Sequence, residues 1–179
     1  MIIRLLCITI IFFGFNASYI IQTTNASPKL GKVEFPTSGS KEAQQHFIRG
    51  VAALHSFWYT EAIDSFQKST KADPNFAMGY WGEAMTHNAP LWERQDSKSA
   101  KAALSKISDL SELTQREQDY IQAVQILYGE GEKLTRDKAY SNAMRGVYIK
   151  YPKDLEAACF YSLSLIGVAK NIRNNLRLH

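Results

Sequence analysis

The stretch that decides the fold is GVAALHSFWYTEAIDSFQKSTKADP, which covers residues 50–74. Within it, Ala62 follows Gly50 by 12 residues, Phe66 follows Ala62 by 4, and Pro74 follows Phe66 by 8. Gly50 and Ala62 are small enough to let two helices approach closely, and Phe66 can fill the space between one hairpin and the next. Pro74 turns the chain because proline cannot continue a helix. This spacing predicts a helical-hairpin repeat, with an unrelated helical bundle as the alternative.

The pattern recurs along the chain, but less completely. A period of 34 residues places small Ala84 at the position of Gly50, and aromatic Tyr80 where the repeat carries a large ring. The pattern is lost near Pro90. Pro152 then lies two periods plus 10 residues beyond Pro74, so the period resumes after an insertion. We therefore expect one clear repeat, one partial repeat and one weak repeat.

Apolar residues at helical spacing continue through the rest of the body, which predicts an all-α fold of antiparallel hairpins. Helix starts are expected near residues 41, 60, 77, 97, 115, 139 and 154. The expected N-caps are Ser40 and Thr60, and Thr114 with Glu117 has the spacing of a capping box. Lys32-Val33-Glu34-Phe35 alternates polar and apolar residues, which predicts a short half-buried strand.

Four segments are expected from composition. Residues 1–26 have one early base, a short apolar run and a small-residue end, as a secretory signal has. The alternatives are an uncleaved N-terminal anchor, which would be the only membrane contact, and a buried first helix. An extended strap follows at 27–40, then the repeat domain at 41–169 and a basic irregular tail at 170–179. The body is expected to be exported, to the periplasm or the outside of the cell.

Charge and cysteine content argue against a nucleic-acid-binding protein and against a disulfide-stabilised one. The net charge is +4, but Arg4, Lys170, Arg173 and Arg177 lie in the two end segments, and the remaining bases equal the 17 acids in number. A neutral body does not suit a nucleic-acid partner. After the leader the only cysteine is Cys159, so no internal disulfide is expected, and its apolar surroundings predict a small buried residue.

Whole phrases of the sequence resemble one family, the N-terminal part of large exported bacterial tetratricopeptide-repeat (TPR) proteins. The resemblance covers roughly residues 30–169 and is carried by LGKVEFPTS (30–38), GVAALHSFWYTEA (50–62), YWGEAM (80–85), TQREQDYI (114–121) and Tyr151-Pro152. It implies an α-helical repeat fold and a role in protein interaction, and it supplies no catalytic motif.

Members of that family continue with many more repeats, so the resemblance implies that this chain is a truncated or frameshifted copy. Repeat arrays normally end in a polar capping helix. Without one, the apolar face that carries Leu155, Cys159 and Ile166 is expected to be open.

The leading functional prediction is a non-enzymatic scaffold that binds a protein or peptide. TPR geometry, carried over residue by residue, selects an apolar concave face that suits a helix or an extended peptide. Its residues are Gln44, Phe47, His55, Met78, Trp81 and Met85. The open alternative is that the strap at 32–35, or further repeats, covers this face.

No metal, nucleophile or phosphate-loop motif is present, so neither an enzyme nor a cofactor is expected. Two other functions are weighed. One is a small-ligand or metal-binding domain that uses a pocket between His55, Trp81 and His87. The other is an inactive fragment of a longer repeat protein.

Overall fold

The structure is a computed structural model that describes residues 29–177, with side chains as far as residue 173. The predicted leader, residues 1–26, lies outside the described residues. The rest confirms an all-α fold of seven α-helices. They are α1 (Lys41–His55), α2 (Tyr59–Ala72), α3 (Ala77–Thr86), α4 (Ser97–Leu104), α5 (Gln115–Leu127), α6 (Lys133–Lys150) and α7 (Leu155–Arg177).

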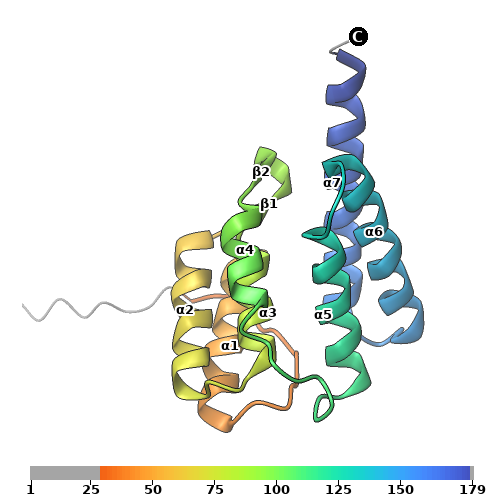
Figure 1. The fold of residues 1–179 in the computed structure, drawn as a ribbon. Helices are drawn as coiled ribbons and strands as arrows, with labels where there is room; N and C mark the ends of the chain where they lie inside the picture. Colours follow the sequence, from red (N-terminus) through yellow and green to blue (C-terminus); the bar gives the residue numbers. More distant parts are fainter. Residues whose placement is uncertain (1–28, 178–179) are drawn as a thin grey trace, which may run out of the picture.

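The helices form two groups, and within each group helices that follow one another in the chain pack side by side (Figure 1). The first group holds α1 to α4 and the second holds α5 to α7. The link after α3 is a small ribbon in which β1 (Asn88–Ala89) pairs antiparallel with β2 (Arg94–Gln95) around the 3-10 turn η1 (Pro90–Trp92). The two groups meet where α3 contacts α5 and where η1 contacts α7.

Side-chain caps begin α1, α4 and α5, whereas α2, α3 and α6 begin without one. The capping box is confirmed, because Thr114 accepts the N–H of Glu117 while the Glu117 carboxylate accepts the N–H of Thr114. Ser40 caps α1 as predicted. The predicted cap at Thr60 is wrong. The carbonyl of Trp58 already accepts the N–H of Ala62 at 2.9 Å, so α2 begins at Tyr59 without a side-chain cap.

The close approach predicted around Phe66 is confirmed. A Cβ atom added to Gly50 would lie 2.7 Å from the Phe66 ring, and one added to Gly82 would lie 2.2 Å from it. Ala62 is fully buried beside them. The 34-residue period predicts that Ala84 occupies the position of Gly50 in the next repeat. Ala84 is buried, but the residue of α3 that lies against Phe66 is Gly82. The helices α1, α2 and α3 therefore meet on one aromatic ring.

The strap takes a different form from the predicted strand. No strand forms at residues 32–35, because the neighbouring elements are helices whose backbone groups are already paired. Side chains hold the strap instead. Gln44 donates to the Phe35 carbonyl at 2.7 Å, Arg116 donates to the Pro36 carbonyl at 3.1 Å, and Glu117 accepts the Ser38 N–H at 2.7 Å.

Two further expectations concern turns and the chain end. Pro74 lies in the α2–α3 turn as predicted, and the hydroxyl of half-buried Tyr80 donates to its carbonyl at 3.0 Å. The predicted irregular tail is wrong over residues 170–177, which continue α7. Lys170 explains part of this continuation, because its ammonium group reaches the Leu91 carbonyl of η1.

Among residues 29–177, none of the helices combines the length and the apolar character that crossing a membrane would require.

Candidate interaction site

Most of the predicted concave face is part of the core. Phe47, Met78, Trp81 and Met85 are each at most 3% exposed. The alternative that the strap covers this face is confirmed, since the Phe35 ring lies 5.2 Å from Phe47 and 5.6 Å from Trp81, centroid to centroid. These four side chains are therefore closed to a partner in this structure.

Helices α5 and α7 complete the cover over Trp81. Tyr120 and Phe160 lie 5.6 Å and 5.3 Å from its ring, both edge-to-face. Gln44 is half-buried and is occupied by the strap. His55 is the one remaining candidate of the six that reaches an open hollow.

The alternative pocket between His55, Trp81 and His87 does not form as expected. His55 forms a short contact with buried Glu156 and lines a hollow beside α7. His87 lines a different hollow, next to the β1–β2 ribbon, and Trp81 is enclosed in the core. Among the described residues, no three side chains of the metal-ligating kind come together.

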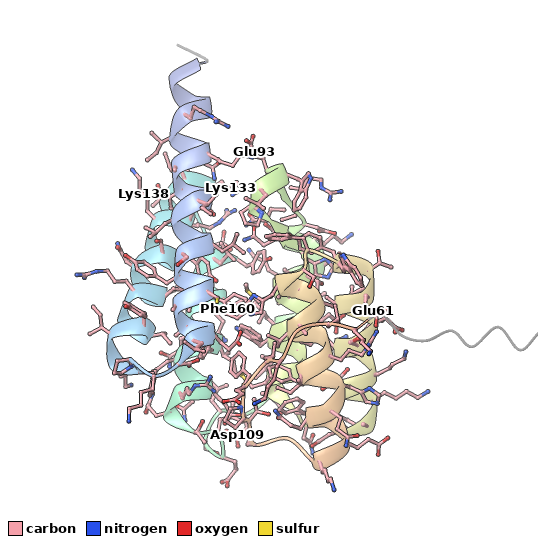
Figure 2. All side chains as sticks on the ribbon, turned by 180° about the vertical axis from the view of Figure 1, so that it is seen from behind. Glu61, Glu93, Asp109, Lys133, Lys138 and Phe160 are labelled. Carbon is pink, nitrogen blue, oxygen red and sulfur yellow. The ribbon has the colours of Figure 1, made fainter. Side chains whose placement is uncertain are left out.

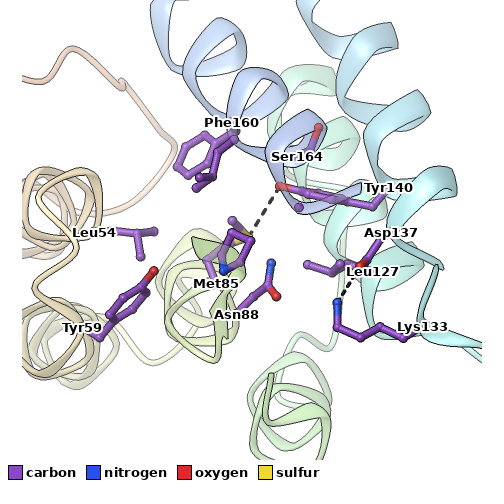
Figure 3. A pocket seen from close by; sticks show the side chains of 13 residues that line it. Leu54, Tyr59, Met85, Asn88, Leu127, Lys133, Asp137, Tyr140, Phe160 and Ser164 are labelled. Carbon is purple, nitrogen blue, oxygen red and sulfur yellow. Dashed lines mark hydrogen bonds and ion pairs between the residues drawn. The ribbon is translucent and has the colours of Figure 1, made fainter. Parts of the chain in front are cut away.

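A small, partly open cavity lies between the two helix groups, and Figure 3 shows the side chains around it. Tyr140 points its hydroxyl at the sulfur of Met85 at 3.9 Å, and Lys133 pairs with Asp137 at 2.5 Å. Burial raises the pKa of the Tyr140 hydroxyl, which keeps it protonated. The cavity volume of about 20 Å³ is room for one water molecule. The cavity is too small for an organic ligand.

The open hollow beside α7 is larger and apolar. We call it the α1–α7 groove, and it offers about 370 Å³. It is lined by Leu54 and His55 from the end of α1, by Phe57 from the turn that follows, and by Ala158, Cys159, Phe160, Ser162, Leu163 and Ile166 from α7. No Lys, Arg, Asp or Glu side chain lines it. The groove can therefore bury apolar surface without removing a charge from water.

An aromatic cluster joins this groove at Phe57. Phe57 has a φ of 59°, an uncommon conformation for a bulky residue, and its ring packs edge-to-face on Trp92 at 5.5 Å. Tyr59 contacts the other side of Trp92 at 6.0 Å. Trp92 remains half exposed. Strained backbone of this kind collects at functional sites, and here it holds the Phe57 ring at the groove.

The open apolar face of α7 is confirmed, whereas the expectation of a buried Cys159 is wrong. Leu155 is 76% exposed, Ile166 is 44% exposed, and Cys159 lies exposed between them. The cause is the helical period, which puts Cys159 on the same side as Leu155 and Ile166 and opposite the buried Phe160. Partial burial, together with the charges of Glu156 and Asp154, raises the pKa of the Cys159 thiol. A protonated thiol is a poor nucleophile.

The chain matches no family model, no curated protein and no solved structure. Its function is therefore argued from the geometry of the groove.

Proposed function

We propose that this protein is an exported, non-enzymatic scaffold with TPR-like helical repeats, and that it binds another protein through the α1–α7 groove. The observation that carries the proposal is the uncharged groove of about 370 Å³ beside the exposed face of α7. Contiguous exposed apolar surface of this kind marks protein-interaction sites.

Repeat chemistry supports the scaffold part of the proposal. Gly50 of α1 and Gly82 of α3 both lie close to the Phe66 ring of α2. The first hairpin therefore packs on α3 through small residues that face a large one, which is the kind of contact by which helical repeats build a continuous core. The strap adds Phe35 to the same core.

The lining chemistry indicates what kind of segment the groove would accept. Its walls are the C-terminal end of α1 and the side of α7, both of them helices, so no open sheet edge is available to add a strand. A partner helix with an apolar face can lie along such a groove, with anchors one turn apart. His55 and Ser162 are the two polar side chains in the lining, and both already have protein partners.

Ile166→Glu is expected to weaken binding of an amphipathic helix by at least about tenfold, which is 1.4 kcal/mol. The substitution places a carboxylate against the apolar face of the bound helix. The probe is a fluorescein-labelled peptide of about five helical turns, with leucines on one face and alternating Lys and Glu on the other. Fluorescence anisotropy measures its dissociation constant.

Ile149→Glu is the matched control, because Ile149 is 59% exposed on α6 and does not line the groove. It should bind the peptide as the natural protein does. Circular dichroism should show both variants folded. Equal binding by the two folded variants, or no binding to the natural protein, would refute the groove as the interaction site.

A further inference from the structure

The outer face of α7 is exposed, uncharged from Leu155 to Ala169, and longer than the groove itself. Figure 2 shows α7 running along the near side of the molecule, with no other helix in front of it. Leu155, Leu165, Ile166 and Ile172 are between 39% and 76% exposed on this face. Small residues separate them, and these are Ala158, Cys159, Ser162 and Ala169. No Lys, Arg, Asp or Glu lies among these eight positions.

The spacing of this face is that of a helix pair. Residues 155, 159, 162, 166 and 169 follow one another in steps of 4, 3, 4 and 3, which averages 3.5. A 3.5-residue repeat keeps a stripe facing a neighbouring helix along its whole length. Helices α1, α2, α3, α5 and α6 each pack closely against at least two other helices, whereas α7 packs closely against one helix, α6, and the turn η1 among the described residues.

We propose that a second copy of this chain fills the face, with its α7 packed antiparallel around a two-fold axis at Ser162. The proposal rests on the proposed function, since it names the helix that the α1–α7 groove receives.

The order of large and small residues is self-complementary under this two-fold axis. Because the axis passes through Ser162 of both copies, a residue of one copy faces the residue of the other for which the two numbers sum to about 324. This holds when both residues lie on the same side of the stripe. Leu165 then faces Ala158 of the second copy, Ile166 faces its Cys159, and Leu155 faces its Ala169. Each of these three large side chains meets a small one, as knobs meet holes in packed helices. A parallel pair would instead bring Leu165 against Leu165 and Ala158 against Ala158.

The residue on the axis can be buried without an unpaired donor. The Ser162 hydroxyl donates to the Ala158 carbonyl of its own helix at 2.8 Å. The Ser162 side chains of two copies can therefore meet as small groups, at little desolvation cost. Because the face is uncharged, two identical copies also bring no like charges together along it.

The area suits a reversible dimer. Four aliphatic side chains per copy leave about half their surface exposed, and the small residues and the groove wall add to this. Two copies together bury on the order of 1,000 Å², which is near the lower limit for a specific interface. We therefore expect a dimer that dissociates in the micromolar range rather than an obligate one.

Cysteine cross-linking of the full chain tests the arrangement. Cys7 and Cys159 are first replaced by serine, and Ser162→Cys is added. Because position 162 lies on the axis, oxidation with diamide should link most of the chains into covalent dimers. Ala102→Cys in the same background is the control, since Ala102 is exposed on α4. Association through the leader would link both variants alike, so equal cross-linking overturns the proposal.

The orientation has its own test. Leu165→Cys and Ala158→Cys chains, in the same serine background, should cross-link with each other when mixed and much less when each is oxidised alone. The opposite outcome, in which each variant links to itself, indicates a parallel pair and overturns the antiparallel arrangement.

Sedimentation equilibrium separates this inference from the proposed function. Ile166→Glu should weaken self-association by roughly a hundredfold, while Ile149→Glu leaves it unchanged. A natural protein that stays monomeric at concentrations about tenfold above the micromolar range refutes the dimer. If that monomer still binds the helical peptide, the groove remains an interaction site for a different partner. If it binds neither, both proposals fail.

Discussion

Phe35→Ala is expected to lower the free energy of unfolding by about 4 kcal/mol, in the range found for buried phenylalanines. Phe35 is fully buried, although it lies in a segment without helix or strand. Its ring contacts Phe47, Trp81 and Tyr120, and the guanidinium group of Arg116 lies 4.2 Å from the ring centroid. Removing the ring leaves a cavity among three helices and exposes the face that the strap covers.

Urea unfolding followed by circular dichroism measures this loss. Lys32→Ala serves as the control, because the Lys32 side chain is 84% exposed in the same strap, and we expect a change within about 0.5 kcal/mol. A loss below about 1 kcal/mol for Phe35→Ala would show that the strap is not part of the folded core. The intrinsic fluorescence of Trp81 should also shift to longer wavelength as water reaches it.

Gly82→Ala is expected to destabilise the protein by about 3 kcal/mol, although alanine is the better helix former. A Cβ atom at this position would lie 2.2 Å from the Phe66 ring, and no real Cβ contact is that short. The ring has little room to retreat, because a Cβ atom added to Gly50 on α1 would itself lie 2.7 Å from it and Phe47 packs on it at 5.7 Å. The helices must separate instead, which loses contacts throughout the hairpin.

The same substitution at Gly146 should have the opposite sign. Gly146 is exposed on α6, and an added Cβ would meet nothing within 4 Å. Gly146→Ala should therefore stabilise the protein by about 0.5 to 1 kcal/mol, through helix propensity alone. Chemical denaturation of the two variants gives both numbers. Phe66→Leu should recover part of the Gly82→Ala loss, and a Gly82→Ala variant as stable as the natural protein would contradict the close packing.

Local patterns were predictable wherever the cause lies within one or two helical turns. The Thr114 and Glu117 capping box, the turn at Pro74 and the period of α7 depend on nearby residues, and the structure has them as expected. The Gly50 and Phe66 contact was also predictable, because the hairpin that brings them together is short. The same reasoning failed at Thr60, where the left-handed conformation of Phe57 shortens the turn.

The site itself could be predicted only in part. Periodicity identified the apolar faces of α1, α3 and α7, because hydrophobic spacing depends on the sequence alone. It could not show which face would be covered. The α1 and α3 faces are closed by Phe35, Tyr120 and Phe160, whereas the α7 face has no cover among the described residues.

The amino-acid sequence alone therefore determines the helices, their caps and the small-to-large contact that stacks the first hairpin, since each of these depends on residues close together in the chain. The tertiary structure decides which apolar face becomes core. Ser38 reaches Glu117, which is 79 residues away, and through this contact the strap is drawn over Trp81. Such a contact depends on the positions of whole helices in space, so only the packed chain reveals that the apolar faces of α1 and α3 are closed.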